Sequence, residues 1–129
     1  MTGRSELRIK LAANAQEAQP VRHALGAFLS AIGIEGVRRE DILTAAGEAL
    51  VNAIEHAYDG RPADTDEIEI FARQEDGTGL VIDVSDRGRF IELAERPGRG
   101  LGLRIARAIA QTVSIDTENG TTVRMIFTT

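Results

Sequence analysis

The chain has 129 residues, a net charge of −5 and no cysteine, so it can form a domain with its own core but no disulfide, thiol nucleophile or cysteine-bound zinc. An acidic balance argues against a general nucleic-acid binder, because such proteins are usually basic. The N-terminus lacks an apolar signal-peptide core, and no apolar run approaches the roughly 20 residues that span a bilayer, which predicts one cytoplasmic domain over residues 1–129 with no membrane or nucleic-acid partner.

The first half of the chain predicts one strand followed by two helices. Residues 6–12 alternate apolar and polar side chains, as in a strand with one buried face. Residues 14–20 are polar and turn-like, and they precede a helix predicted over 21–32 that Gly33 ends. The longest helix is predicted over 38–58, where apolar side chains recur at helical spacing and define one buried stripe. The stripe consists of Ile42, Ala46, Ala49, Leu50, Ala53 and Ala57.

The second half predicts two hairpins and a third helix. Both hairpins alternate apolar and polar residues and turn at segments rich in Gly, Asn and Asp. The polar stretch 86–99 lacks periodicity and is unusually long for a loop in a compact domain, which favours a lid or binding loop. The third helix is predicted over 101–110. The strands are predicted at residues 67–73, 79–85, 112–118 and 121–129.

The order of these elements predicts the class of fold. Hairpins imply an antiparallel or mixed sheet, and helices bury their apolar stripes by packing against such a sheet. We therefore expect an α+β fold, a two-layer α/β sandwich whose sheet is mixed but mostly antiparallel, with three helices on one face.

The long helix carries polar residues that suit phosphate chemistry. Glu48, Asn52 and His56 are spaced four residues apart, so they share one side of the helix. A carboxylate there can act as a general base, and an amide oxygen can bind a hard cation such as Mg²⁺. Taken alone, these residues fit the solvated side of an amphipathic helix better.

A glycine-rich segment opens the third helix. Its alternating glycines leave backbone N–H groups open to phosphate oxygens, and a helix N-terminus adds partial positive charge. The spacing matches neither a Walker A motif nor a dinucleotide fingerprint. The segment between residues 87 and 107 contains six arginines and two glutamates, which indicates a confined anionic ligand or a solvated Arg-rich surface. The candidate phosphate-binding residues are Gly98, Arg99, Gly100, Leu101, Gly102 and Leu103.

Two short segments could contact a nucleotide base. Asp86 ends an apolar strand and can accept a hydrogen bond from a base amino group, while Gly88 would let a ring approach the backbone. Thr121 follows Gly120 at the start of the last strand and could complete the same pocket. Each segment is also an ordinary turn.

In this order, the four segments resemble the GHKL ATPase superfamily, which has the Bergerat fold. The family's motifs are similar to residues 48–53, 86–88, 98–103 and 120–121 of this chain. Within the superfamily, residues 48–58 look most like the helix of anti-sigma-factor serine kinases.

The resemblance implies an ATP or ADP site with Mg²⁺. It implies that Glu48 is the general base, that Asn52 is the Mg²⁺ ligand, and that Asp86 contacts adenine. The segment 100–103 would cradle phosphates, and Thr121 would lie near adenine.

The same resemblance implies a partner-switching protein. We expect a protein-serine kinase that phosphorylates a STAS-domain anti-anti-sigma partner, sequesters a sigma factor or another regulator, and forms a homodimer. Phe90 replaces the family's second glycine after Asp86, which motivates an alternative, a nucleotide-binding module that captures a partner without kinase activity. A histidine kinase is a third hypothesis, but His23 lacks the acidic neighbour expected of a phosphoacceptor.

Overall fold

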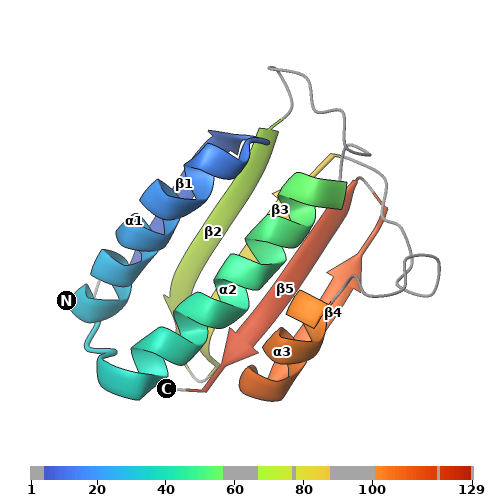
Figure 1. The fold of residues 1–129 in the computed structure, drawn as a ribbon. Coiled ribbons are helices and arrows are strands. Elements are labelled where there is room, and N and C mark those ends of the chain that lie inside the picture. Colours follow the sequence, from blue (N-terminus) through green and yellow to red (C-terminus); the bar gives the residue numbers. More distant parts are fainter. Residues whose placement is uncertain (1–4, 57–66, 77, 88–100, 119, 129) are drawn as a thin grey trace.

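The computed structural model describes residues 5–56, 67–76, 78–87, 101–118 and 120–128. These residues form a five-stranded sheet, and Figure 1 shows all three long helices on the same face of it. The strands are β1 (Glu6–Ala12), β2 (Glu67–Glu75), β3 (Gly79–Asp86), β4 (Thr112–Asp116) and β5 (Thr121–Phe127). The helices are α1 (Ala18–Ala31), α2 (Gly36–His56) and α3 (Leu101–Ile109), with a short 3-10 turn, η1, at Ala15–Glu17.

The sheet has the strand order β1-β2-β3-β5-β4. Each neighbouring pair is antiparallel. The sequence predicted a mixed, mostly antiparallel sheet, and the described strands pair only in the antiparallel way. The predicted α+β two-layer sandwich is confirmed. The β4–β5 hairpin places β5 beside β3, and this pairing brings the end of one strand next to the start of the other.

The core lies between the sheet and the helices. Along β3, the residues Leu80, Ile82 and Val84 point to the helix-covered face and belong to the buried cluster. Val81, Asp83 and Ser85 point to the opposite face, as the period-two geometry of a strand requires. The predicted stripe of α2 is buried from Ile42 to Ala53, while Ala57 lies outside the described residues.

The predicted start of the first helix is wrong by three residues. α1 begins at Ala18 rather than residue 21. Asn14 accepts a hydrogen bond from the Gln16 amide at 2.8 Å and so caps η1, and the chain continues from this turn directly into α1. Pro20 then lies in the first turn of α1, where its missing N–H breaks no helical hydrogen bond.

Other boundaries shift by one or two residues. α2 begins at Gly36, which precedes the predicted residue 38, and β4 ends at Asp116 rather than residue 118. β2 extends into the predicted turn as far as Glu75. None of the described helices is long and apolar enough to cross a membrane.

Candidate functional site

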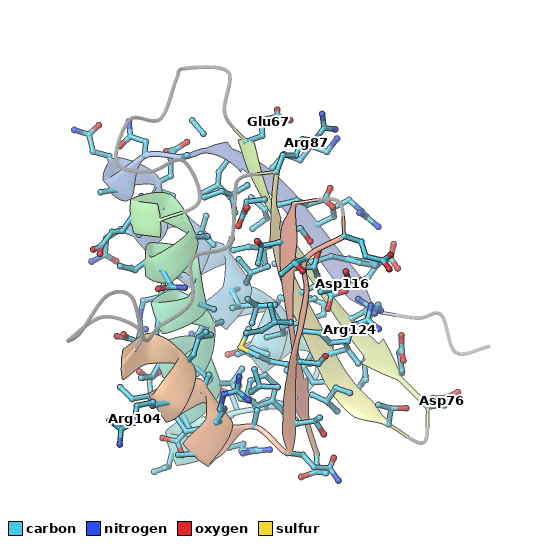
Figure 2. All side chains as sticks on the ribbon, turned by 90° about the vertical axis from the view of Figure 1, so that its right-hand side faces the viewer. Glu67, Asp76, Arg87, Arg104, Asp116 and Arg124 are labelled. Atoms are coloured by element: carbon cyan, nitrogen blue, oxygen red, sulfur yellow. The ribbon has the colours of Figure 1, made fainter. Side chains whose placement is uncertain are left out.

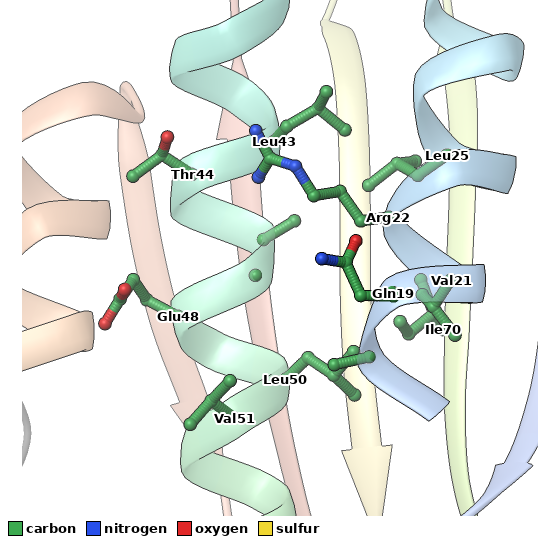
Figure 3. A pocket seen from close by; sticks show the side chains of 13 residues that line it. Gln19, Val21, Arg22, Leu25, Leu43, Thr44, Glu48, Leu50, Val51 and Ile70 are labelled. Carbon is green, nitrogen blue, oxygen red and sulfur yellow. The ribbon is translucent and has the colours of Figure 1, made fainter. Parts of the chain in front are cut away.

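The helix α2 presents both residues predicted to handle the transferred phosphate. Ala49 and Leu50 are buried against the core, and this packing fixes the rotation of the helix. Glu48 and Asn52 consequently lie at its partly exposed margin. Glu48 points from α2 toward the side on which α3 lies (Figure 3). The structure therefore leaves the Glu48 carboxylate accessible to a ligand, as a general base requires. The side chain of His56 is outside the described set.

Asp86 and Thr121 meet at one end of the sheet. Asp86 is the last residue of β3, Thr121 is the first residue of β5, and the two are register partners. Both are on the helix-covered face, since they alternate with Ser85 and Thr122, whose hydroxyls bond each other at 3.0 Å on the other face. Asp86 is only 8% exposed and Thr121 only 5%. Two buried polar side chains therefore stand side by side at this end of the core.

The Thr121 hydroxyl has no partner in the part of the chain that the structure describes. Its Oγ1 atom is buried without a hydrogen bond. Leaving a buried hydroxyl unpaired costs about 1–3 kcal/mol, so a ligand atom that pairs with it would recover that energy. A carboxylate offers about four lone-pair sites, so Asp86 can accept a further hydrogen bond beside its existing interaction. This pair fits an adenine ring, whose amino group donates and whose ring nitrogens accept.

Gly120 makes this pairing possible, and sequence reasoning treated it only as a turn residue. Its φ is +84°, and an added Cβ would overlap the Asp86 carbonyl oxygen and lie 2.6 Å from the Cα of Arg87. A side chain at this position would therefore displace Asp86. The Asn-Gly pair in the sequence signals the positive φ, but the close approach depends on the register between β3 and β5.

The glycine-rich segment is described only from its helical end. α3 begins at Leu101, as predicted, and packs beside α2 (Figure 1). Leu103 is fully buried in the core, so its side chain anchors α3 and only its backbone can face a phosphate. The predicted site residues Gly88, Gly98, Arg99 and Gly100 lie outside the described residues, as do the side-chain surroundings of Leu101 and Gly102.

The described parts of the site share one end of the molecule. The end of α2, the end of β3 and the start of β5 lie together in the upper part of Figure 1. α2 also packs on both of these strands. Among the described residues no cluster of three or more His, Asp or Glu side chains could hold a metal. A Mg²⁺ ion at Asn52 would therefore depend on water and substrate phosphates for its other ligands, which is its usual coordination.

The exposed side of α3 is basic. Arg104 and Arg107 are exposed, and Figure 2 shows Arg104 on the side of α3 that faces away from the sheet. His23 is also exposed, on α1.

Comparison with known proteins identifies related sequences. Residues 11–127 match the family model described as a histidine kinase-like ATPase domain. A serine-protein kinase RsbW of Bacillus pumilus is 26% identical over 136 residues, which cover 92% of this chain and 83% of that protein.

Solved structures show the same fold. The RsbU and RsbW domains of a Mycobacterium tuberculosis protein match with a TM-score of 0.69 and 25% identity, covering 95% of this chain and 32% of that one. This chain therefore spans about a third of the mycobacterial chain. The histidine kinase domain of a blue-light activated histidine kinase from Erythrobacter litoralis matches with a TM-score of 0.58 and 24% identity, covering 83% of this chain and 60% of that one.

Proposed function

Because the chain belongs to the family of histidine kinase-like ATPase domains, we propose that it is an ATP-dependent protein-serine kinase of the anti-sigma type. In this proposal it phosphorylates a STAS-domain anti-anti-sigma protein, and it sequesters a sigma factor or another regulator. The similarity to an RsbW serine-protein kinase supports this proposal. We further propose that it acts in the cytoplasm, as a homodimer of single-domain subunits.

The main observation that supports an ATP site is the buried pair of Asp86 and Thr121 at the end of the sheet. Asp86 would accept from the adenine amino group, and the unpaired Thr121 hydroxyl would bond a ring nitrogen. Both groups are held by the pairing of β3 with β5, so a base site built on them would be preformed. Recognition by buried polar groups discriminates strongly, because a ligand that lacks the partner atoms leaves them unpaired.

The phosphates would extend from this pocket toward α2 and the start of α3. We propose that Asn52 holds Mg²⁺, which would neutralise phosphate charge. The glycine-rich run from Gly98 to Leu103, with Arg99 as a charged partner and Gly88 near the base, would bind the rest of the nucleotide. Backbone N–H groups at a helix N-terminus suit this role.

Glu48 would act on the phosphoacceptor. Its carboxylate takes the proton of the substrate serine hydroxyl while the serine oxygen bonds the γ-phosphorus of ATP. The bond from that phosphorus to the bridging oxygen breaks, and ADP leaves with the electron pair. Phosphoryl transfer depends on positioning and charge stabilisation more than on covalent chemistry, so Glu48 would be the only proton acceptor that the step needs, beside the groups that bind the phosphates.

Substitution of Glu48 tests the kinase proposal. The chain would be incubated with labelled ATP, Mg²⁺ and the STAS-domain protein encoded beside its gene, and phosphoserine on that protein would be measured. We expect transfer by the wild type and a loss of about 10²-fold or more in Glu48→Gln, the usual contribution of a general base. Glu55→Gln is the matched control, because Glu55 is an exposed carboxylate on the same helix. Unchanged transfer by Glu48→Gln would contradict the role of Glu48.

A partner-capture module without kinase activity is the second candidate. The phenylalanine at position 90, where the family has a glycine, favours it. Tight nucleotide binding by the wild type with no phosphoserine on any bound partner would establish this alternative and exclude the kinase.

A further inference from the structure

Gly47 occupies an interior position of α2 that the described structure does not explain. Glycine is a poor helix former, because it loses more backbone freedom on folding than any other residue. A Cβ built at Gly47 would have Nη1 of Arg22 as its nearest neighbour, at 4.0 Å, which is an ordinary contact. An alanine would therefore fit, and the described residues make no use of the space that the glycine leaves open.

Gly26 on α1 is a helical glycine whose missing side chain has a clear structural reason. A Cβ there would lie 2.6 Å from Nη2 of Arg39, and Nε of Arg39 donates to the Gly26 carbonyl at 3.2 Å. The lack of a side chain at Gly26 thus makes room for the guanidinium group of Arg39 on α2. Among the residues that the structure describes, no side chain fills the space over Gly47 in the same way.

The space over Gly47 belongs to a groove of about 330 Å³ along α1 and α2. Figure 3 shows Glu48 and Thr44 on one side of α2, and Gln19 and Arg22 on α1 across the groove. The groove is mostly apolar, and the candidate general base stands at its rim. Its apolar lining includes Val21, Leu25, Leu43, Ala46, Leu50 and Ile70.

The charge at the groove favours an acidic partner on the α1 side. Residues 18–31 of α1 include Arg22 and no Asp or Glu. Arg22 pairs with Glu40 at 3.2 Å, but the two side chains are 42% and 56% exposed, and such surface pairs contribute little. Arg22 can therefore exchange Glu40 for a carboxylate of a docked molecule.

We infer that this groove receives a loop of the phosphoacceptor protein. An apolar side chain of the loop enters over Gly47, an acidic residue pairs with Arg22, and the acceptor hydroxyl reaches Glu48. The inference rests on the proposed kinase function for the identity of the occupant. The absence of a side chain at Gly47 is then explained, because it lets the loop approach the backbone of α2 one residue from the general base.

Enlarging residue 47 tests this inference. The probes are the STAS-domain proteins encoded in the source genome, and binding is measured by calorimetry with ATP affinity followed in parallel. We expect Gly47→Ala to melt a few degrees higher, since alanine favours the helix, yet to bind the partner several-fold more weakly. Gly47→Leu should weaken binding more than tenfold with unchanged ATP affinity. The matched control is Ala27→Leu, which enlarges an exposed α1 residue that does not line the groove.

Charge reversal gives a second measure. Arg22→Glu should weaken partner binding and flatten its salt dependence, whereas loss of the Glu40 pair alone would change neither. Wild-type partner affinity in both Gly47→Leu and Arg22→Glu would overturn the inference, as would the failure of every STAS-domain protein to bind the wild type.

The outcomes for the groove and for the kinase remain separate. If Gly47→Leu abolishes binding of a partner that the wild type never phosphorylates, the groove is correct and the kinase proposal fails. If the wild type phosphorylates the partner and Gly47→Leu keeps the same KM for it, the kinase is correct and the groove is refuted.

Discussion

At Thr121, a substitution that removes the side-chain hydroxyl should raise the stability of the ligand-free protein but weaken ATP binding. The Thr121 Oγ1 is buried without a partner among the described residues. Thr121→Val replaces the hydroxyl by a methyl group of similar shape, so we expect the ligand-free protein to gain about 1 kcal/mol of stability. The lost hydrogen bond to adenine should weaken ATP binding about tenfold, or about 1.4 kcal/mol. Urea denaturation and a fluorescent-nucleotide titration measure the two effects.

The neighbouring residue supplies the control for this experiment. Thr122 faces the other side of the sheet, where its hydroxyl bonds Ser85 at 3.0 Å. Thr122→Val should therefore leave ATP affinity unchanged and give no gain in stability. If Thr121→Val binds ATP as tightly as the wild type, its hydroxyl does not contact the base.

Among the elements, the sheet is fastened on its helix-free face by an ion-pair network. Asp83 on β3 is 8% exposed; its two carboxylate oxygens accept from Arg124 on β5 at 2.8 and 2.9 Å, and one accepts from Arg73 on β2 at 3.2 Å. Arg73 also packs over the ring of Phe71. The network therefore ties three adjacent strands, and Figure 2 shows Arg124 on the side of the sheet opposite the helices.

Removing Asp83 should cost more than removing an exposed partner. Asp83→Ala removes one acceptor from the partly buried Arg73, and we expect a loss of about 2 kcal/mol of unfolding free energy. Glu69→Ala is the control, because its pair with Arg8 at 3.0 Å is more exposed and should contribute less than about 1 kcal/mol. Chemical denaturation compares the two variants. Equal losses would show that the network adds nothing beyond surface pairing.

The charge of Arg124 determines what this residue contributes to the pH dependence of protein stability. The hydrogen bond and the charge of Asp83 raise the pKa of the Arg124 guanidinium. A group whose pKa is raised by folding stabilises the protein below its unfolded pKa, and this contribution is lost only as pH rises through the folded value. Arg124 therefore contributes no pH dependence to stability between neutral pH and about pH 9.

The elements also show what sequence periodicity can and cannot predict. Alternation located β1 at its observed bounds, and the apolar stripe located α2, because both patterns record burial directly. The sequence could not predict that β5 rather than β4 pairs with β3, since either strand of the hairpin could have filled that place. The close approach of Gly120 to Asp86 follows from this pairing. The sequence could therefore supply the candidate residues on the sheet, Asp86 and Thr121, but not their arrangement.

For the molecule as a whole, the two faces of the sheet have different roles. The helix-free face carries ion pairs that satisfy one another, such as Asp83 with Arg124 and Arg8 with Glu69. The helix-covered face buries the core and ends in Asp86 and Thr121. A ligand seated on Asp86 and Thr121 would contact both the sheet and the helix layer, so its binding should stabilise the fold itself.

ATP should therefore raise the melting temperature of the whole chain. At a free ATP concentration about 100 times its Kd, linkage predicts about 2.7 kcal/mol of added stability, or several degrees in Tm for a chain of this size. Glu48→Gln should keep this shift, because the general base acts on the serine hydroxyl rather than on the nucleotide. Asp86→Ala should lose most of it, and each variant is compared with itself with and without ATP, so a change in intrinsic stability does not affect the result. An equal shift in Asp86→Ala and the wild type would remove Asp86 from the base site, and no shift in the wild type would refute the ATP site altogether.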